Sequence, residues 1–275
     1  MLAYGGVSIV NAIPCWKGSS MAINLGVTEV NIIKGRELEE KDPLLQTIVS
    51  YFREKYGLEP FDVKVKSNIP RRSGLKSSSA VANAVIYEIS REFKIENINV
   101  PYLSAILSKK AGVSITGAFD DATASYYGGI TFTNNKINAL KRIYHVKDDI
   151  KIVIVPRERP KNMNILKLKK FREVFCEIWN IGFKGNIYLA MKLNGILVGK
   201  ILEYDFPIKN IDRNSEVLAY GISGNGPSFF VVVKEGEEGF IIDKLSQVVG
   251  KDNIVVTEAV DVDCERLPVN YKRYC

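Results

Sequence analysis

Ile69-Pro70-Arg71-Arg72-Ser73-Gly74-Leu75-Lys76-Ser77-Ser78-Ser79-Ala80 is the stretch of sequence that decides the fold. Alternating apolar residues predict a strand before it at 61–67, and an apolar-periodic run predicts a helix after it at 78–93. A loop of small residues between a strand and a helix directs unpaired backbone N–H groups and the positive end of the helix dipole at one point. The stretch therefore predicts a phosphate site, although an ordinary serine-capped helix gives the same local pattern.

A second informative segment, residues 116–129, contains two adjacent acids, Asp120 and Asp121, at the start of a short helical turn between small residues. Buried carboxylates are costly unless a cation or hydrogen-bond donors accompany them. A metal-bound phosphate nearby would supply the cation, and one carboxylate could then orient or accept a hydroxyl proton. Considered alone, the pair is explained equally well as an Asp N-cap on a surface helix.

The third segment is the glycine-rich turn Gly221–Ser228, which precedes the apolar run Phe229–Val233. Glycines allow a ligand to approach the backbone closely, but a lone turn of this kind is also consistent with a simple hairpin. The three segments in this order indicate a ligand site much more strongly than any one of them.

Length, charge and composition limit the class of protein. The chain has 275 residues, which suggests about two domains at roughly 150 residues each. Its net charge is +7, from 38 basic and 31 acidic residues. This excess fits a moderately basic enzyme with anionic substrates as well as a nucleic-acid-binding protein. Basic and aromatic residues are not interleaved as in RNA-binding modules, so we expect no nucleic-acid partner.

The cysteines and the single histidine exclude several kinds of chemistry. The four cysteines are scattered without a CxxC pair, and His145 is the only histidine. Structural zinc is therefore disfavoured, a disulfide framework is not implied, and a Ser-His-Asp or Cys-His mechanism is unsupported. We expect a structural role for His145. The sequence has no run of 18 apolar residues and no signal-peptide pattern at its start, so we expect a cytoplasmic protein without a membrane partner.

Periodicity predicts an α+β mixture of elements rather than a regular βαβ series. In the first part of the chain we expect strands at 2–11, 22–33, 61–67, 128–134, 137–146 and 151–155, a small-residue loop at 15–20, and helices at 43–56, 78–93 and 101–110. In the second part we expect helices at 163–181, 186–203 and 239–248 and strands at 217–223, 228–234 and 253–260. A basic break at 157–161 suggests two domains, 1–155 and 156–275.

The order and content of the three segments resemble the GHMP kinase superfamily. Its middle motif, roughly Pro-x-x-x-Gly-Leu-Gly-Ser-Ser-Ala, is matched at Pro70, Gly74, Leu75, Ser77 and Ser78, and Lys76 takes the place of the third glycine. Four blocks resemble in particular the archaeal shikimate kinase subfamily: 11–19 (Asn-Ala-Ile, then Lys-Gly-Ser), 76–80 (Lys-Ser-Ser-Ser-Ala), 117–122 (Gly-Ala-Phe-Asp-Asp-Ala) and 221–227 (Gly-Ile-Ser-Gly-Asn-Gly-Pro). The pattern is not a P-loop, since the required glycine spacing is absent.

This resemblance implies a two-domain α+β GHMP kinase fold, with a ribosomal-protein-S5-like N-terminal domain and a ferredoxin-like C-terminal domain. It implies ATP-dependent phosphorylation of the 3-hydroxyl of shikimate, with Mg²⁺. The catalytic residue would be Asp121, seven residues before Gly128. ATP would contact Arg72, Ser73, Gly74, Leu75, Lys76, Ser77, Ser78, Ser79, Gly224 and Gly226, and Ser78 would hold the metal. Shikimate would contact Lys17, Ser19, Asp120, Asp121 and Arg157.

Several alternatives stay open at this point. Lys17, Arg157 and Arg159 each offer a cation for the carboxylate of shikimate, and a basic loop at a domain junction is also explained as a solvated surface. A kinase of the same fold could act on homoserine or on a mevalonate-type alcohol. A non-catalytic anion-binding module is a third reading. The sequence does not indicate the oligomeric state.

Overall fold

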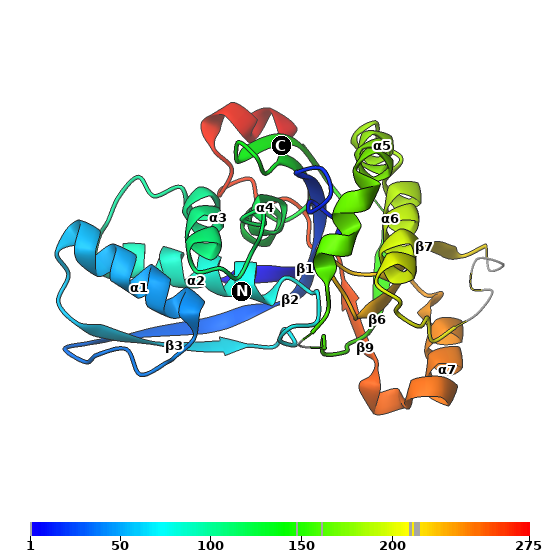
Figure 1. Cartoon of the computed structure of the whole chain (residues 1–275), viewed down its shortest axis with the longest axis horizontal. Helices are drawn as coiled ribbons and strands as arrows, with labels where there is room; N and C mark the ends of the chain where they lie inside the picture. The colour runs from blue at the N-terminus through cyan, green and yellow to red at the C-terminus, as the bar shows by residue number, and fades with distance from the viewer. Residues whose placement is uncertain (1, 147, 161, 209–210, 212–214) are drawn as a thin grey trace.

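Two antiparallel sheets with helices packed against them form the protein in this computed structural model, which describes residues 2–146, 148–160, 162–208, 211 and 215–275 (Figure 1). The first sheet has the order β1-β2-β4-β5, with β3 also paired to β2. Its strands are β1 (Ala3–Val10), β2 (Lys17–Lys34), β3 (Phe61–Ser67), β4 (Ile130–Asn134) and β5 (Ala139–Tyr144). The second sheet has the order β7-β8-β6-β9. Its strands are β6 (Ile150–Val155), β7 (Val217–Ile222), β8 (Phe229–Lys234) and β9 (Val255–Glu258).

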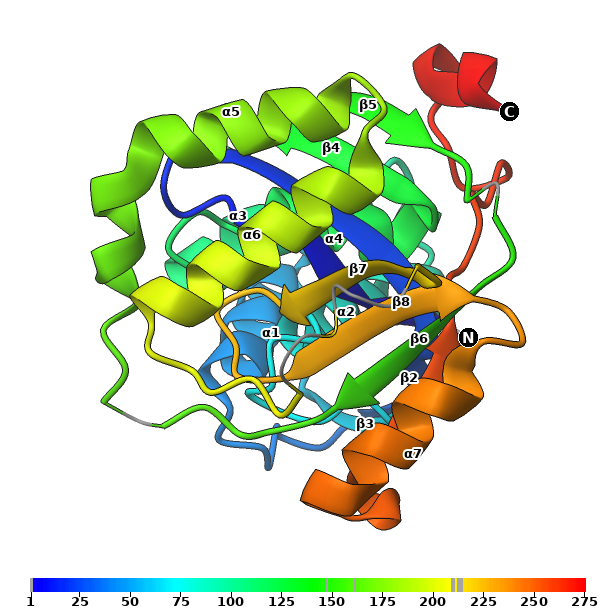
Figure 2. The ribbon, with the colours of Figure 1, turned by 90° about the vertical axis from the view of Figure 1, so that its right-hand side faces the viewer.

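The helices are divided between the two sheets. Beside the first sheet lie α1 (Pro43–Tyr56), α2 (Ser77–Glu92), α3 (Val100–Lys110) and α4 (Phe119–Tyr127). The second half contains the 3-10 helix η1 (Ile165–Phe171), α5 (Arg172–Phe183), α6 (Ile187–Ile201) and α7 (Glu238–Val249), with short 3-10 turns at Lys251–Asn253 and Val269–Tyr274. Figure 2 shows α5 and α6 side by side. Because α6 contacts both β7 and β1, it joins the two halves.

Local chemistry explains why the predicted elements form where they do. Asp42 caps α1 by accepting hydrogen bonds from the backbone N–H groups of Leu44 (2.9 Å) and Leu45 (3.3 Å), with Pro43 in the first turn. Gly57 ends the helix in the left-handed conformation at φ 63°. The α+β mixture with two sheets is confirmed.

Two sequence expectations are wrong in detail. The small-residue loop expected at 15–20 is mostly strand, because β2 begins at Lys17 and residues 17–21 pair with β4. These small polar residues enter the sheet since β1 and β4 hydrogen-bond to β2 on its two edges. The helix expected over 163–181 is also divided, into η1 and then α5 from Arg172.

The change from strands of the first sheet to strands of the second sheet occurs before residue 150. β6 precedes the boundary expected at residue 155, yet it pairs with β8 and β9 of the second sheet. The largest cluster of buried apolar side chains combines residues of β1 and β2 with residues of β6, β8, α5 and α6. The division at 155 therefore stays a prediction, and it does not follow the sheets.

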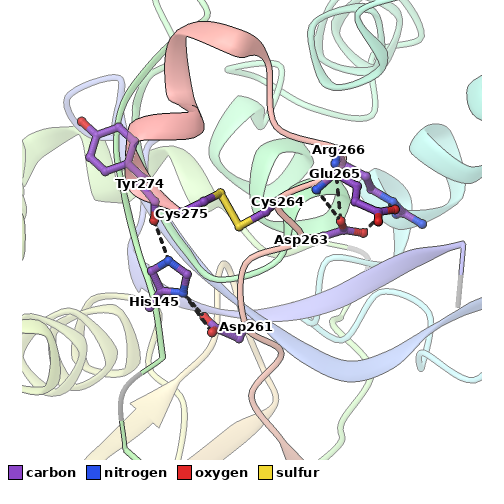
Figure 3. Close-up of a disulfide and its surroundings, with 8 residues drawn as sticks. All are labelled: His145, Asp261, Asp263, Cys264, Glu265, Arg266, Tyr274 and Cys275. Carbon is purple, nitrogen blue, oxygen red and sulfur yellow. Dashed lines mark hydrogen bonds and ion pairs between the residues drawn. A yellow bond between two sulfur atoms is a disulfide. The ribbon is translucent and has the colours of Figure 1, made fainter.

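The C-terminal residues return to the first half and are fastened there (Figure 3). A disulfide joins Cys264 and Cys275, whose Cα atoms are 5.9 Å apart, although the sequence did not imply a disulfide framework. The final turn of the chain brings the two cysteines within bonding reach, which their scatter in the sequence did not reveal. His145 contacts the carboxylate of Asp261 (2.9 Å) and the carbonyl of Tyr274, which confirms a structural role for it. Among the described residues, no helix has the length and apolar character needed to cross a bilayer.

Candidate active site

One cavity of about 330 Å³ lies where the three segments of the sequence meet. The loop before α2, the start of α4 and the glycine-rich turn after β7 all line it. Residues 11–13 after β1 and residues 112–116 after α3 also contribute to its wall. The predicted convergence of three distant stretches is therefore observed.

The loop before α2 lies directly on the glycine-rich turn. Ser223 donates a hydrogen bond from its hydroxyl to the carbonyl of Gly74 (2.9 Å), and the backbone N–H of Ser228 donates to the carbonyl of Ser73 (3.1 Å). Gly74 has a φ of +87°, and a Cβ at this position would overlap the carbonyl oxygen of Ser223. Only glycine fits a backbone approach this close at positive φ.

The N-terminus of α2 presents free donors to the cavity. The first helical hydrogen bond runs from the N–H of Ala80 to the carbonyl of Lys76 (3.1 Å). The N–H groups of Ser77, Ser78 and Ser79 precede that bond and have no acceptor within the helix. All three serines line the cavity. Together with the helix dipole, these groups can hold an anion such as a phosphate.

Lys76 and Asp121 form an ion pair at the edge of the cavity. Their Nζ and Oδ1 atoms are 2.8 Å apart, and their side chains are only 7% and 16% exposed. Ser20 donates its hydroxyl to the same Oδ1 (2.6 Å), and Lys76 also donates to the hydroxyl of Ser8 (2.6 Å). Both contacts of Asp121 use Oδ1, so Oδ2 has no partner among the residues that the structure describes.

Lys76 reaches Asp121 because its backbone is left-handed, with a φ of 68°. This conformation suits glycine, and a residue with a Cβ adopts it at a cost of roughly 1–2 kcal/mol. The lysine in the third-glycine place therefore retains the backbone shape of the motif and adds an ammonium group beside the carboxylate.

Asp120 is a buried carboxyl group beneath the pair. Its Oδ1 accepts a hydrogen bond from the amide of Asn135 (2.7 Å), and it packs against Gly18, where a Cβ would overlap the carboxyl group. Burial, and then the charge of Asp121, raises the pKa of Asp120 to about 7, although Lys76 and Asn135 act in the opposite direction. Asp120 is therefore poised to change its charge near neutral pH.

The oxygen donors at the cavity fit Mg²⁺ better than a metal that needs an all-protein cage. No group of three or more His, Cys, Asp or Glu side chains in the described parts of the chain could hold a metal ion. Hydroxyl and carboxylate oxygens of Ser78 and Asp121 line the cavity beside the anion site. Mg²⁺ retains several waters and binds through one or two protein oxygens plus phosphate oxygens, which this donor set can satisfy.

The structure brings most of the predicted site residues to this cavity. Arg72, Ser73, Gly74, Lys76, Ser77, Ser78, Ser79, Asp120, Asp121 and Gly224 line it. Two of the predicted ATP contacts do not line the cavity. Leu75 is fully buried in the core, and Gly226 packs against Tyr204 behind the glycine-rich turn. Both residues shape the loops that carry the lining residues.

Three predicted contacts of the acceptor also lie outside the cavity lining. Lys17 is the first residue of β2, and its side chain lines a separate hollow. The ammonium of Lys17 lies 4.9 Å from the centroid of the Trp179 ring. Ser19 is fully buried, and its hydroxyl has no hydrogen-bond partner among the residues that the structure describes. Arg157 donates from its guanidinium to the carbonyl of Asp205 (3.1 Å), which directs it elsewhere.

Sequence reasoning missed residues that complete the site. Asn11 links the first block to the glycine-rich turn, because its side-chain amide donates to the carbonyl of Gly224 (3.0 Å) and to Oδ1 of Asn225 (2.8 Å). Asn11 belongs to the block 11–19 that carries the resemblance to the family, and this resemblance could have identified it from the sequence. Ser8 falls in an expected strand and Ser20 in the expected loop at 15–20, and no local pattern marks either of them.

Arg159 is the predicted alternative that does line the cavity. Burial and then the neighbouring Arg72 cation lower the pKa of Arg159, while Tyr204 acts in the opposite direction. Lys76 is paired with Asp121, and Arg72 lies 3.8 Å from Glu158. Arg159 forms no ion pair with an acidic residue in the described ranges, so it offers an uncompensated positive charge to a ligand.

The known proteins that are similar to this chain belong to the family that its sequence motifs resemble. The family model of the GHMP kinases N terminal domain matches residues 43–129. Shikimate kinase of Pyrococcus furiosus is 35% identical over 252 residues, covering 84% of this chain and 90% of the relative. Shikimate kinase of Methanothermobacter thermautotrophicus is 31% identical over 269 residues, covering 92% of each chain. The crystal structure of Methanococcus jannaschii mevalonate kinase is similar with a TM-score of 0.67 at 17% identity, over 95% of this chain and 97% of that one. This last similarity concerns the fold, and it confirms the fold expected from the resemblance.

Proposed function

The chain belongs to the archaeal shikimate kinases of the GHMP kinase family, and from this premise we propose that it transfers the γ-phosphoryl group of ATP to the 3-hydroxyl of shikimate. The observation that carries the proposal is the convergence of the serine-rich loop, Asp121 and the glycine-rich turn on one cavity. Each supplies a different part of phosphoryl transfer: anion binding, activation of the acceptor and close backbone approach.

The nucleotide phosphates would lie along the loop from Ser73 to Ser79. The free N–H groups at the start of α2 would bind them, and the helix dipole would favour their negative charge. Gly224 lines the same cavity next to Gly74 and has no side chain that would take up space there, while Arg72 supplies a further cation at the cavity. This arrangement positions the γ-phosphoryl group and stabilises charge, which is most of what the reaction requires of a protein.

Mg²⁺ would be held by the hydroxyl of Ser78, with phosphate oxygens and water completing its coordination. When bound, it neutralises charge on the phosphates. Lys109 and Lys110 line a neighbouring hollow and not this cavity.

Asp121 would orient the acceptor hydroxyl and accept its proton. Lys76 and Ser20 hold Oδ1, which fixes the carboxylate in place. Oδ2 is then available for the hydroxyl of the acceptor. The acceptor oxygen attacks the γ-phosphorus, its bond to phosphorus forms as the bond to the β–γ bridging oxygen breaks, and ADP leaves.

The carboxylate of shikimate needs a cation, and we assign this role to Arg159 rather than Arg157. Arg159 lines the cavity with an uncompensated charge, whereas Arg157 is bonded to the carbonyl of Asp205 outside it. A guanidinium group can bind a carboxylate through two parallel hydrogen bonds, which fixes orientation as well as charge.

A panel assay tests this function. ADP release is measured with ATP and Mg²⁺ against shikimate, homoserine and mevalonate at equal concentrations, and ³¹P and ¹H NMR identifies the phosphorylated carbon. We expect turnover with shikimate alone and a phosphate ester at its 3-position. Turnover that prefers homoserine or mevalonate, or no acceptor-dependent ADP release, would contradict the proposal.

A further inference from the structure

A second hollow of about 530 Å³ lies beside the catalytic cavity, and we call it the basic hollow. Its cationic wall comes from three places in the chain: Lys17 at the start of β2, Lys136 in the turn after β4, and Lys169 with Arg172 at the junction of η1 and α5. Trp16 forms an aromatic part of the wall. The basic hollow and the catalytic cavity share one lining residue, Ile13.

The positive charges of the basic hollow are not compensated. No acidic residue is among its lining residues, and none of its four cations forms an ion pair within the described parts of the chain. Some lysines elsewhere are paired with acidic residues. Lys66 pairs with Glu29 at 2.6 Å, and Lys167, next to this region, pairs with Glu203 at 2.8 Å. Like charges gathered within a Debye length repel each other, so a bound anion would stabilise this arrangement.

We propose that the basic hollow is a second anion-binding site, which takes a small molecule with two or more phosphate or carboxylate groups. Its volume is within the range of small-ligand pockets. Arg172 can bind a phosphate or carboxylate through two hydrogen bonds, and the lysines add point charges around it. A single carboxylate would leave most of the four charges unmatched, which favours a polyanion.

This site is independent of phosphoryl transfer. Lys136, Lys169 and Arg172 are absent from the lining of the catalytic cavity, and no step assigned to Asp121 or to the serine-rich loop involves them. The inference therefore remains testable whatever acceptor the enzyme uses.

The two tryptophans of the chain provide a direct readout. Trp16 lines the basic hollow, and the ring of Trp179 lies under the ammonium of Lys17. Inorganic pyrophosphate is titrated into the full chain while tryptophan fluorescence is recorded, and calorimetry gives the stoichiometry. The nucleotide loop is first filled with a saturating non-hydrolysable ATP analogue. We expect a saturable fluorescence change and one pyrophosphate per chain, weakened by added NaCl.

The matched variants are Lys169→Ala/Arg172→Ala and a control, Lys244→Ala/Lys251→Ala, which removes the same charge from exposed positions around α7. The first pair should weaken pyrophosphate binding by about tenfold or more, the factor that two partly exposed ion pairs supply. The control should bind like the wild type. Equal binding by all three proteins, loss of all binding when the ATP analogue is present, or binding of an oligonucleotide but not of pyrophosphate would each overturn the proposal. Circular dichroism shows whether every variant is folded.

Discussion

The ion pair between Lys76 and Asp121 gives a prediction that the structure makes quantitative. Replacing Lys76 with Met removes the ammonium but retains a long side chain. The carboxylate of Asp121 then lies at a site where it is 16% exposed, and the hydroxyl of Ser20 is its one remaining partner among the described residues. Breaking a buried pair by removing one partner costs about 3–5 kcal/mol. Because Asp121 has some access to water and keeps one hydrogen bond, we expect Lys76→Met to lower the free energy of unfolding by about 2–3 kcal/mol.

A double-mutant cycle separates the pair from other effects. Asp121→Asn alone leaves Lys76 unpaired, whereas Lys76→Met/Asp121→Asn removes both charges. The double variant should therefore lose about 2 kcal/mol less free energy of unfolding than the two single variants lose in total. Lys76→Gly is an additional control, since glycine relieves the left-handed backbone at φ 68° while removing the same charge. It should be more stable than Lys76→Met by roughly 1 kcal/mol.

The assay is urea unfolding without nucleotide, followed by tryptophan fluorescence, with thermal unfolding as a second measurement. For a chain of this size, 2–3 kcal/mol should lower the Tm by roughly 4–12 °C. Strict additivity of the two single variants would refute the reasoning, because it would mean that the two charges do not interact in the folded protein.

Three further predictions concern the same cavity. The folded protein holds the pKa of Asp120 at about 7, above the roughly 4 of an unfolded chain, so wild type loses stability as pH rises through that window. The free energy of unfolding of Asp120→Asn relative to wild type should thus increase from about pH 4 to 7 and then level off; a constant difference would contradict the assignment. Arg159→Ala should raise the KM for shikimate by about 10- to 100-fold with little change for ATP, whereas Arg157→Ala should leave it nearly unchanged, as steady-state kinetics will measure. Gly74→Ala should raise the KM for ATP and destabilise the fold by about 1–3 kcal/mol, because its Cβ has no room, whereas Gly239→Ala, in open space on α7, should not destabilise it; equal unfolding midpoints for the two would count against the close packing of the loop.

Features encoded within a few neighbouring residues were predictable from the sequence. The cap at Asp42, the alternation of β3 and the small-residue loop before α2 each depend on local backbone chemistry, and each is found where it was expected. The three motifs were predictable as a set because each is contiguous. Their convergence followed from the resemblance to a known family rather than from periodicity.

Features that depend on tertiary pairing were not predictable. Residues 17–20 look like a loop because they are small and polar, but pairing with β1 and β4 makes them strand. That difference changes which way the side chains face, so Ser20 contacts Asp121 while Lys17 lies in the basic hollow. The disulfide of Cys264 and Cys275 likewise depends on how the last turn of the chain returns on itself.

The catalytic assignment is tested most directly by kcat of Asp121→Asn with ATP, Mg²⁺ and shikimate, measured at a temperature where circular dichroism shows the variant fully folded. Since proton transfer by a positioned group contributes typically about 10²–10⁴-fold, kcat should fall by at least about 100-fold. Ser20→Ala, which removes only one hydrogen bond to the carboxylate, should have a much smaller effect. Near-normal turnover in folded Asp121→Asn would contradict the account.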